Sequence, residues 1–107
     1  LNEMAEKADV GIEVREAAVP VDFSVASASS VLGIEPMNVA NEGAVVFGVD
    51  ADDAEDVLEA IRSHPLGESA AIVGEVIDEH AGSVVRDTGL GRRFLRAPEG
   101  NQLPRIC

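Results

Sequence analysis

The residue best suited to chemistry is Cys107, which ends the chain and is its single cysteine. An ionised thiol is a nucleophile, and at the end of a chain it can also serve as a covalent carrier. One cysteine excludes an internal disulfide framework and any cysteine-rich metal site. Prenylation does not fit either, because it requires a cysteine four residues from the end. Composition alone leaves one alternative open, a cysteine that is incidental or forms disulfides between molecules.

The residues before this cysteine are suited to presenting it. Residues 100–107 are Gly-Asn-Gln-Leu-Pro-Arg-Ile-Cys. Pro104 favours an extended conformation in the residue before it, and an extended chain places Arg105 and Cys107 on the same side. The terminal carboxylate opposes ionisation of the thiol, whereas a neighbouring guanidinium favours the thiolate. We therefore predict an extended tail that carries a nucleophile at its end.

Hydrophobic periodicity predicts the elements that must position this tail. Apolar residues at positions 1, 4, 5 and 8 predict a helix already under way at the first residue, so we expect the chain to be a piece of a longer protein. Gly33 is placed to end a helix, and residues 88–91 are typical of a hairpin turn. A further helix is predicted at residues 23–32, and another in which apolar residues at 54, 57, 58 and 61 line one face and which Pro65 ends. Strands are predicted at residues 10–15, 44–49, 70–77, 83–86 and 92–95. This order predicts an α+β fold, with helices packed on a mixed or antiparallel sheet and an extended C-terminal tail.

Composition narrows the environment and the partners. The 107 residues carry a net charge of −12, which disfavours nucleic acid and anionic membranes as partners. No apolar run approaches the roughly 18–20 residues of a spanning helix, and no signal peptide is visible, so we expect a cytoplasmic protein. The charge is typical of a halophilic protein, because high salt screens self-repulsion, although an ordinary acidic protein is the alternative. Aromatic residues make up 3% of the chain, too few for stacking platforms.

The tail carries a resemblance to a known family. The ending Gln-Leu-Pro-Arg-Ile-Cys at residues 102–107 resembles the C-terminus of the hydrogenase maturation factor HypE family. These proteins are carbamoyl dehydratases of the AIR-synthase-related (PurM-like) superfamily. Residues 38–43 and the segments 64–67 and 71–74 look like the same family. The resemblance spans Leu1 to Cys107 and covers the family's C-terminal domain, and the tail is its specific part.

The resemblance implies a two-stage use of the thiol. A HypF-type carbamoyltransferase would load a carbamoyl group onto Cys107, giving a thiocarboxamide. ATP would then phosphorylate the amide oxygen, and loss of phosphate and two protons would leave a thiocyanate. The cyano group would pass to iron on a HypC–HypD scaffold and become a ligand of the [NiFe]-hydrogenase site. Activation by phosphorylation makes chemical sense, because an amide oxygen is otherwise a poor leaving group.

The resemblance also suggests further site residues. Glu42, in the loop that enters the predicted strand at 44–49, matches a glutamate associated in the family with deprotonating the amide nitrogen, a step that needs a positioned base. A loop carboxylate that caps backbone N–H groups is the alternative. Asn41 and Gly43 would approach a phosphate or simply shape the loop. Arg105 would tune the thiol or contact phosphate, or form an ordinary salt bridge.

The family's ATP cleft, with which Mg²⁺ is expected, is built mainly by an N-terminal domain and at a homodimer interface. We therefore expect residues 1–97 to form the C-terminal domain, residues 98–107 to form the tail, and this chain alone to be inactive in dehydration. The competing hypothesis is a non-catalytic structural or interaction domain of another ATP-dependent enzyme in the superfamily.

Other polar groups are predicted to be structural. The acidic run at residues 50–56 does not match a calcium loop, and it suits the positive end of a helix. His64 and His80 are too few to make a zinc site with Cys107, so no metal ligand is predicted.

Overall fold

The computed structural model describes residues 1–39 and 41–96, and the chain divides into two compact units. Unit 1 comprises residues 1–20 and 49–96, and the described part of unit 2 comprises residues 21–48. Cys107 and Arg105 lie outside the described residues, as does the predicted tail.

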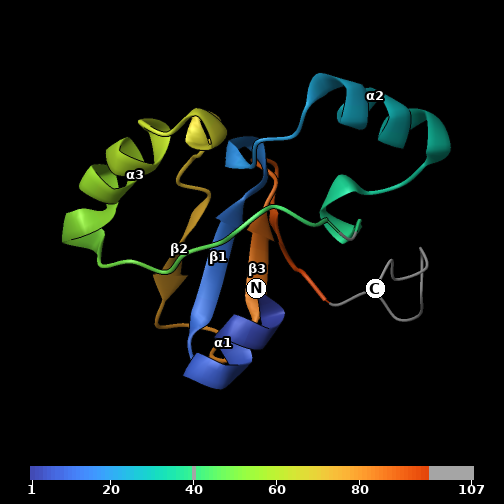
Figure 1. The fold of residues 1–107 in the computed structure, drawn as a ribbon. Helices are drawn as coiled ribbons and strands as arrows, with labels where there is room; N and C mark the ends of the chain where they lie inside the picture. Colours follow the sequence, from blue (N-terminus) through green and yellow to red (C-terminus); the bar gives the residue numbers. More distant parts are fainter. Residues whose placement is uncertain (40, 97–107) are drawn as a thin grey trace. The chain divides into compact units, whose positions relative to one another are not determined.

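A four-stranded mixed sheet forms the centre of unit 1 (Figure 1). The strand order is β2-β1-β3-β4, in which β1 is parallel to β3 while the two outer pairs, β1–β2 and β3–β4, are antiparallel. The mixed sheet confirms the predicted α+β class. The strands are β1 Gly11–Arg15, β2 Gly74–Ile77, β3 Val84–Asp87 and β4 Arg92–Phe94.

The core of unit 1 lies along its two central strands. Val14 of β1 and Val84 of β3 are each 1% exposed, and Ala5 of the first helix is fully buried. Ile12 lies opposite Val84 in the parallel register, so β-branched side chains meet across the ladder. The alternation predicted for residues 10–15 therefore corresponds to the central strand of the sheet.

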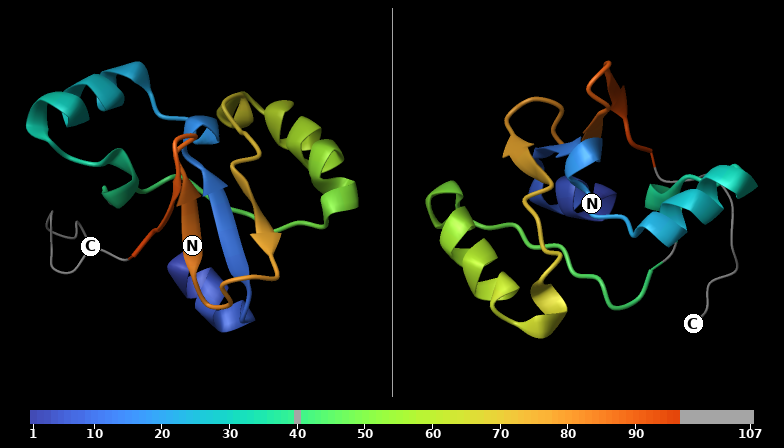
Figure 2. Two further views of the ribbon diagram at one scale, coloured as in Figure 1. Left: turned by 180° about the vertical axis from the view of Figure 1, so that it is seen from behind. Right: turned by 90° about the horizontal axis from the view of Figure 1, so that it is seen from above.

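Two helices, α1 Asn2–Ala8 and α3 Ala54–Arg62, lie on the same side of the sheet, and the view from behind shows no helix in front of the strands (Figures 1 and 2). The acidic residues before and within the first turn of α3 face the positive end of its dipole, as predicted. At the other end, Arg62 Nε donates to the carbonyl of Ala70 at 2.8 Å. Short 3-10 turns complete the unit: η1 Glu16–Ala18, η3 Ala51–Asp53 and η4 Pro65–Gly67.

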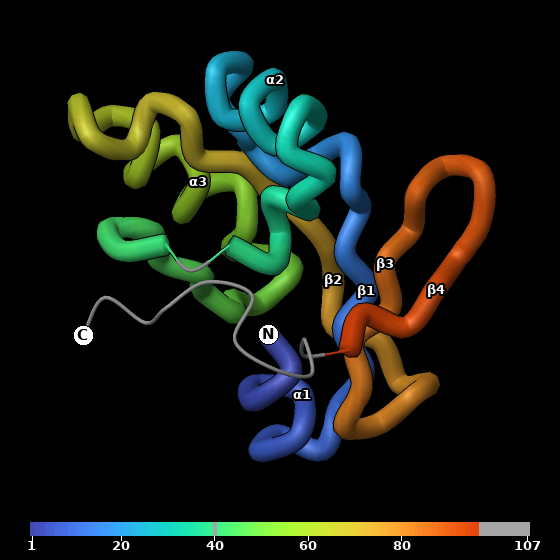
Figure 3. Tube along the Cα trace, turned by 90° about the vertical axis from the view of Figure 1, so that its right-hand side faces the viewer, coloured from blue at the N-terminus to red at the C-terminus, as the bar shows by residue number. Residues whose placement is uncertain are grey.

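Unit 2 contains α2 Phe23–Leu32 and the turn η2 Pro36–Asn38, followed by an irregular segment (Figure 3). Asp22 caps α2 by accepting a hydrogen bond from the Ser24 backbone N–H at 2.8 Å and another from the Ser24 hydroxyl. The hydroxyl bond, and after it the backbone bond, lowers the pKa of Asp22 below its ordinary value of 3.8. Gly33 ends the helix at φ 66°, which confirms the predicted left-handed cap.

The prediction of a strand at residues 44–49 is wrong for this structure. The segment has no strand pairing, and Val45, Val46 and Phe47 are 71%, 52% and 63% exposed. An apolar run indicates a strand only if a partner strand and a covering layer exist, and neither is found for this segment among the described residues. The predicted strand at 70–77 is also shorter than expected, because pairing with β1 covers only β2. Among residues 1–39 and 41–96, no helix has the length and apolar character needed to cross a bilayer.

Candidate functional site

The predicted residues 41–43 follow η2 in unit 2. The chain reaches them through a series of local backbone bonds that leave little freedom after α2. The Ile34 N–H donates to the Ser29 carbonyl at 2.9 Å, and the Val39 N–H donates to the Pro36 carbonyl at 3.1 Å. Pro36 sits in the first turn of η2, where its missing N–H costs no hydrogen bond. The loop thus begins from a fixed turn, although it does not lead into the expected buried strand.

Glu42 is exposed, as are Asn41 and Gly43 on either side of it. The described residues of unit 2 do not enclose it, so exclusion of water would have to come from another surface. The structure therefore places the Glu42 carboxylate on an exposed loop.

Gly43 has φ 87°, a conformation that favours glycine, and an added Cβ would meet nothing within 4 Å. The requirement for glycine at this position is therefore one of backbone conformation, not of close approach by another part of the chain. This geometry matches the turn role considered for Gly43.

The structure keeps Asn41, Glu42 and Gly43 together as one exposed loop. It does not place Cys107 or Arg105, which lie outside the described residues. The geometry between the predicted base and the predicted thiol therefore remains a prediction from the sequence.

Two ion pairs on the sheet were not predicted. Glu13 of β1 is only 8% exposed, and its carboxylate lies 3.2 Å from Arg92 Nη2 of β4. A carboxylate this buried needs a partner, and the guanidinium supplies one. The signal was present in the sequence, because Glu13 stands between Ile12 and Val14 in a strand that is buried on both faces.

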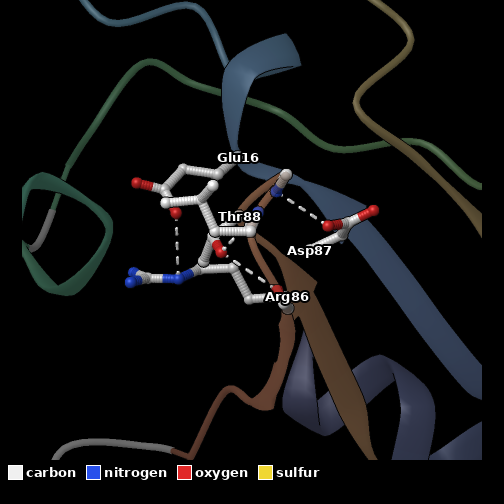
Figure 4. Close-up of polar contacts among 7 residues, drawn as sticks. Glu16, Arg86, Asp87 and Thr88 are labelled. Carbon is white, nitrogen blue, oxygen red and sulfur yellow. Dashed lines mark hydrogen bonds and ion pairs between the residues drawn. The ribbon is translucent and has the colours of Figure 1, made fainter.

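The second pair joins η1 to β3 (Figure 4). Arg86 Nε lies 3.3 Å from a carboxylate oxygen of Glu16. Beside it, the hairpin between β3 and β4 is closed by side chains: the Gly89 N–H donates to Asp87 at 2.8 Å, and the Thr88 hydroxyl donates to the Gly91 carbonyl at 3.0 Å. This confirms the predicted hairpin turn at residues 88–91 and gives its glycines a structural role.

The histidines also have structural contacts. His64 Nδ1 accepts the Leu66 N–H at 3.2 Å, and the His80 ring stacks edge-on against Phe94 with centroids 5.2 Å apart. Across the part of the chain that the structure describes, no three His, Cys, Asp or Glu side chains gather closely enough to hold a metal ion.

Comparison with known families gives a match over most of the chain. Residues 1–87 match the family described as "AIR synthase related protein, C-terminal domain". A putative hydrogenase expression/formation protein of Methanocaldococcus jannaschii is 45% identical over the whole of this chain. Carbamoyl dehydratase HypE of Escherichia coli (strain K12) is 43% identical, again over the whole chain. In both cases the match covers 32% of the relative, so the chain spans about a third of the length of the curated relatives it matches.

Solved structures give the same picture. A crystal structure of hydrogenase maturation protein HypE superposes with a TM-score of 0.91 at 42% identity, covering 100% of this chain and 36% of that one. HypE in complex with ATP gives 0.90 at 41% identity, covering 100% and 33%. A HypE–HypF complex gives 0.85 at 40% identity, covering 92% and 32%. The fold of this chain is therefore similar to one third of each of these proteins.

Proposed function

This chain belongs to the family of AIR synthase related proteins, C-terminal domain, and on that premise we propose that it is the thiol-bearing part of a hydrogenase-maturation carbamoyl dehydratase. The observation that carries the proposal is the identity of 43–45% with hydrogenase-maturation relatives over the whole of this chain, Cys107 included. In this proposal residues 1–97 form the domain, and residues 98–107 form the tail that presents the thiol.

The proposed chemistry uses Cys107 as a covalent carrier. Its thiolate attacks the carbon of an activated carbamoyl group that is bound by a HypF-type transferase and derived from carbamoyl phosphate and ATP. A C–S bond forms, and the phosphate or nucleotide group that activated the carbamoyl carbon leaves. The amide oxygen of the thiocarboxamide then takes the γ-phosphoryl group of ATP, and one N–H proton leaves. Breaking the C–O bond expels phosphate, and the second N–H proton is removed to give the thiocyanate. The S–C bond is then cleaved with two electrons from a reductant on the HypC–HypD scaffold, so that cyanide passes to iron and Cys107 returns as the thiolate.

Two roles are proposed for other residues of this chain. Glu42 accepts a proton from the amide nitrogen, which requires another surface to close over its exposed loop. Arg105 favours the thiolate or contacts phosphate, while Asn41 and Gly43 shape the loop. The HypE structure solved with ATP supports ATP as the phosphoryl donor, and the HypE–HypF complex supports a HypF-type partner. From the family resemblance we also propose that ATP and Mg²⁺ bind mainly on polypeptide beyond this chain, in a homodimer.

The carrier role is tested by intact-mass analysis. The chain is incubated with a HypF-type transferase, carbamoyl phosphate and ATP, and we expect a gain of one carbamoyl group. The Cys107→Ala variant should gain nothing. If that variant takes up the same mass, the modification lies elsewhere and the carrier role is wrong. Thiocyanate formed on this chain alone would contradict the proposed division of labour.

The role of Glu42 needs the whole catalytic assembly. A chimera, in which this chain replaces the matching third of the Methanocaldococcus jannaschii relative, supplies it. We expect Glu42→Gln in the chimera to be carbamoylated normally and to lose dehydration by about 10²–10⁴-fold, the usual worth of a general base. Glu35→Gln, a carboxylate of the same unit, is the matched control and should retain activity. Equal loss in both variants would assign Glu42 a structural role.

A further inference from the structure

The apolar segment Ala44–Val49 has the composition of a strand but no strand partner among the residues that the structure describes. Apolar side chains occupy both of its alternating faces, a pattern typical of a strand buried on both sides. Val45, Phe47 and Val49 would share one face, and they are 71%, 63% and 48% exposed. Both requirements of a buried strand, a neighbour and a covering layer, are therefore unmet.

The backbone of the segment is equally unpartnered. Within residues 1–39 and 41–96, no hydrogen bond involves an N–H or carbonyl group from Ala44 to Val49. None of these residues is a proline, so each has a donor as well as an acceptor. A row of unpaired groups next to apolar side chains is a template for pairing with another strand. Its two ends are well defined, by Gly43 in its positive-φ turn and by Asp50, whose carboxylate accepts the Asp52 N–H at 3.0 Å.

The rest of unit 2 shows the same lack of cover. Among its described residues only Ser29 is buried, whereas Phe23, Val31 and Leu32 of α2 are 86%, 87% and 69% exposed. A helix and a strand-like segment normally bury their apolar sides against another layer. Exposed apolar surface on this scale marks an interaction site, so unit 2 requires a layer that the described residues do not provide.

We propose that Ala44–Val49 is a strand completed by β-strand addition, and that its partner is an apolar strand in the polypeptide that the relatives carry beyond the third matched here. The length of the relatives supports this occupant, because the match covers only 31–32% of those that span the whole chain. A second copy of this chain is disfavoured, since two molecules of charge −12 would repel each other. Main-chain hydrogen bonds would hold the pair, and the apolar side chains would be covered on both faces.

The test compares amide hydrogen exchange in two proteins, this chain alone and the chimera, both carrying Cys107→Ala so that the thiol plays no part. We expect the amides of residues 45–49 to exchange on the order of 100-fold more slowly in the chimera, while β1 and β3 are protected in both. Because the readout is exchange rather than activity, it is independent of the proposed function.

Substitutions give the matched controls. Val46→Pro removes a backbone donor from the centre of the segment and should abolish the protection of its neighbours in the chimera. Leu90→Asp changes a fully exposed apolar residue at the hairpin tip and should leave it intact. If β1 and β3 stay protected in the Val46→Pro variant, the protein has folded and the loss is local.

Three results would overturn the proposal. Residues 45–49 could remain unprotected in the chimera, which would show that no added strand reaches them. They could be protected in the monomeric chain alone, which would assign the partner to this chain's own strands. Protection that rises with concentration, together with a dimer in sedimentation, would assign the partner to a second copy.

Discussion

Units 1 and 2 contain residues of similar hydrophobicity but use them in opposite ways. In unit 1 the β-branched residues of β1 and β3 are paired in a ladder and buried, with Val14 and Val84 at 1% exposure. In unit 2 the valines of α2 and of residues 44–48 are exposed, and the one buried residue that the structure describes there is Ser29. Composition alone therefore does not decide burial.

The contrast shows which unit can account for its own stability. Unit 1 satisfies its strand backbones within the mixed sheet and covers its apolar residues with the sheet and helices of the same unit. In the described part of unit 2, the backbone–backbone hydrogen bonds lie within α2, at its ends and in local turns. It follows that unit 1 is the scaffold, and that unit 2, with its loop at residues 41–43, presents surface for something else to complete.

The largest expected difference between the two units is in the effect of one valine-to-alanine substitution on the free energy of unfolding. Val14→Ala should lower the free energy of unfolding by about 2–3 kcal/mol, because it leaves a cavity in the sheet core. Val31→Ala, on α2, should change it by less than about 0.5 kcal/mol in this chain. Urea denaturation followed by circular dichroism measures both. Equal effects would show that α2 is buried as deeply as β1.

A smaller effect is expected from the ion pair of Glu13. Arg92→Ala leaves a mostly buried carboxylate without its partner and should cost about 1 kcal/mol of unfolding free energy. The neighbouring Arg93 is exposed, and among the described residues it has no ion pair, so Arg93→Ala is the control and should cost close to nothing. The same urea denaturation experiment measures the free energy of unfolding of both variants. Equal values would show that the Arg92 ion pair with Glu13 does not stabilise the fold.

The smallest effect concerns the cap of α2. The pKa of Asp22 is lowered by hydrogen bonds from Ser24, so the ionised carboxylate favours the folded helix end. Its contribution is complete above the ordinary pKa of 3.8 and is lost as the pH falls through the lower value of the folded state. The Ser24 amide should therefore exchange faster, relative to its intrinsic rate, below that window. The Asp22→Asn variant should lose this pH dependence. An unchanged pH profile in that variant would show that the ionised Asp22 carboxylate does not stabilise the start of α2.

Local signals predicted most of the fold correctly. The bounds of α2, its cap at Gly33 and the hairpin at residues 88–91 follow from turn residues and helical spacing, which act over a few residues. The Glu13–Arg92 pair was not predicted, because it joins residues 79 positions apart whose contact depends on strand order. Strand order in turn depends on long-range pairing, which no local pattern specifies.

The candidate site divides in the same way. Residue chemistry selected Cys107 and Arg105, and the family resemblance, made specific by the tail at residues 102–107, added Glu42. The structure added that Glu42 and its neighbours are exposed and that Gly43 is required by its backbone conformation. It could not have been known from the residues alone that this loop leads into an unpaired segment.

The sequence by itself determined the local elements, the acidic surface charge and the family resemblance, because each depends on residue types and short spacings. Only the tertiary structure decided which apolar segments are buried. Val14 lies between the charged residues Glu13 and Arg15 and is buried, whereas Val46 lies between Val45 and Phe47 and is 52% exposed. The reason is physical: burial of a strand requires hydrogen-bonding neighbours and a covering layer, and these come from distant parts of a polypeptide.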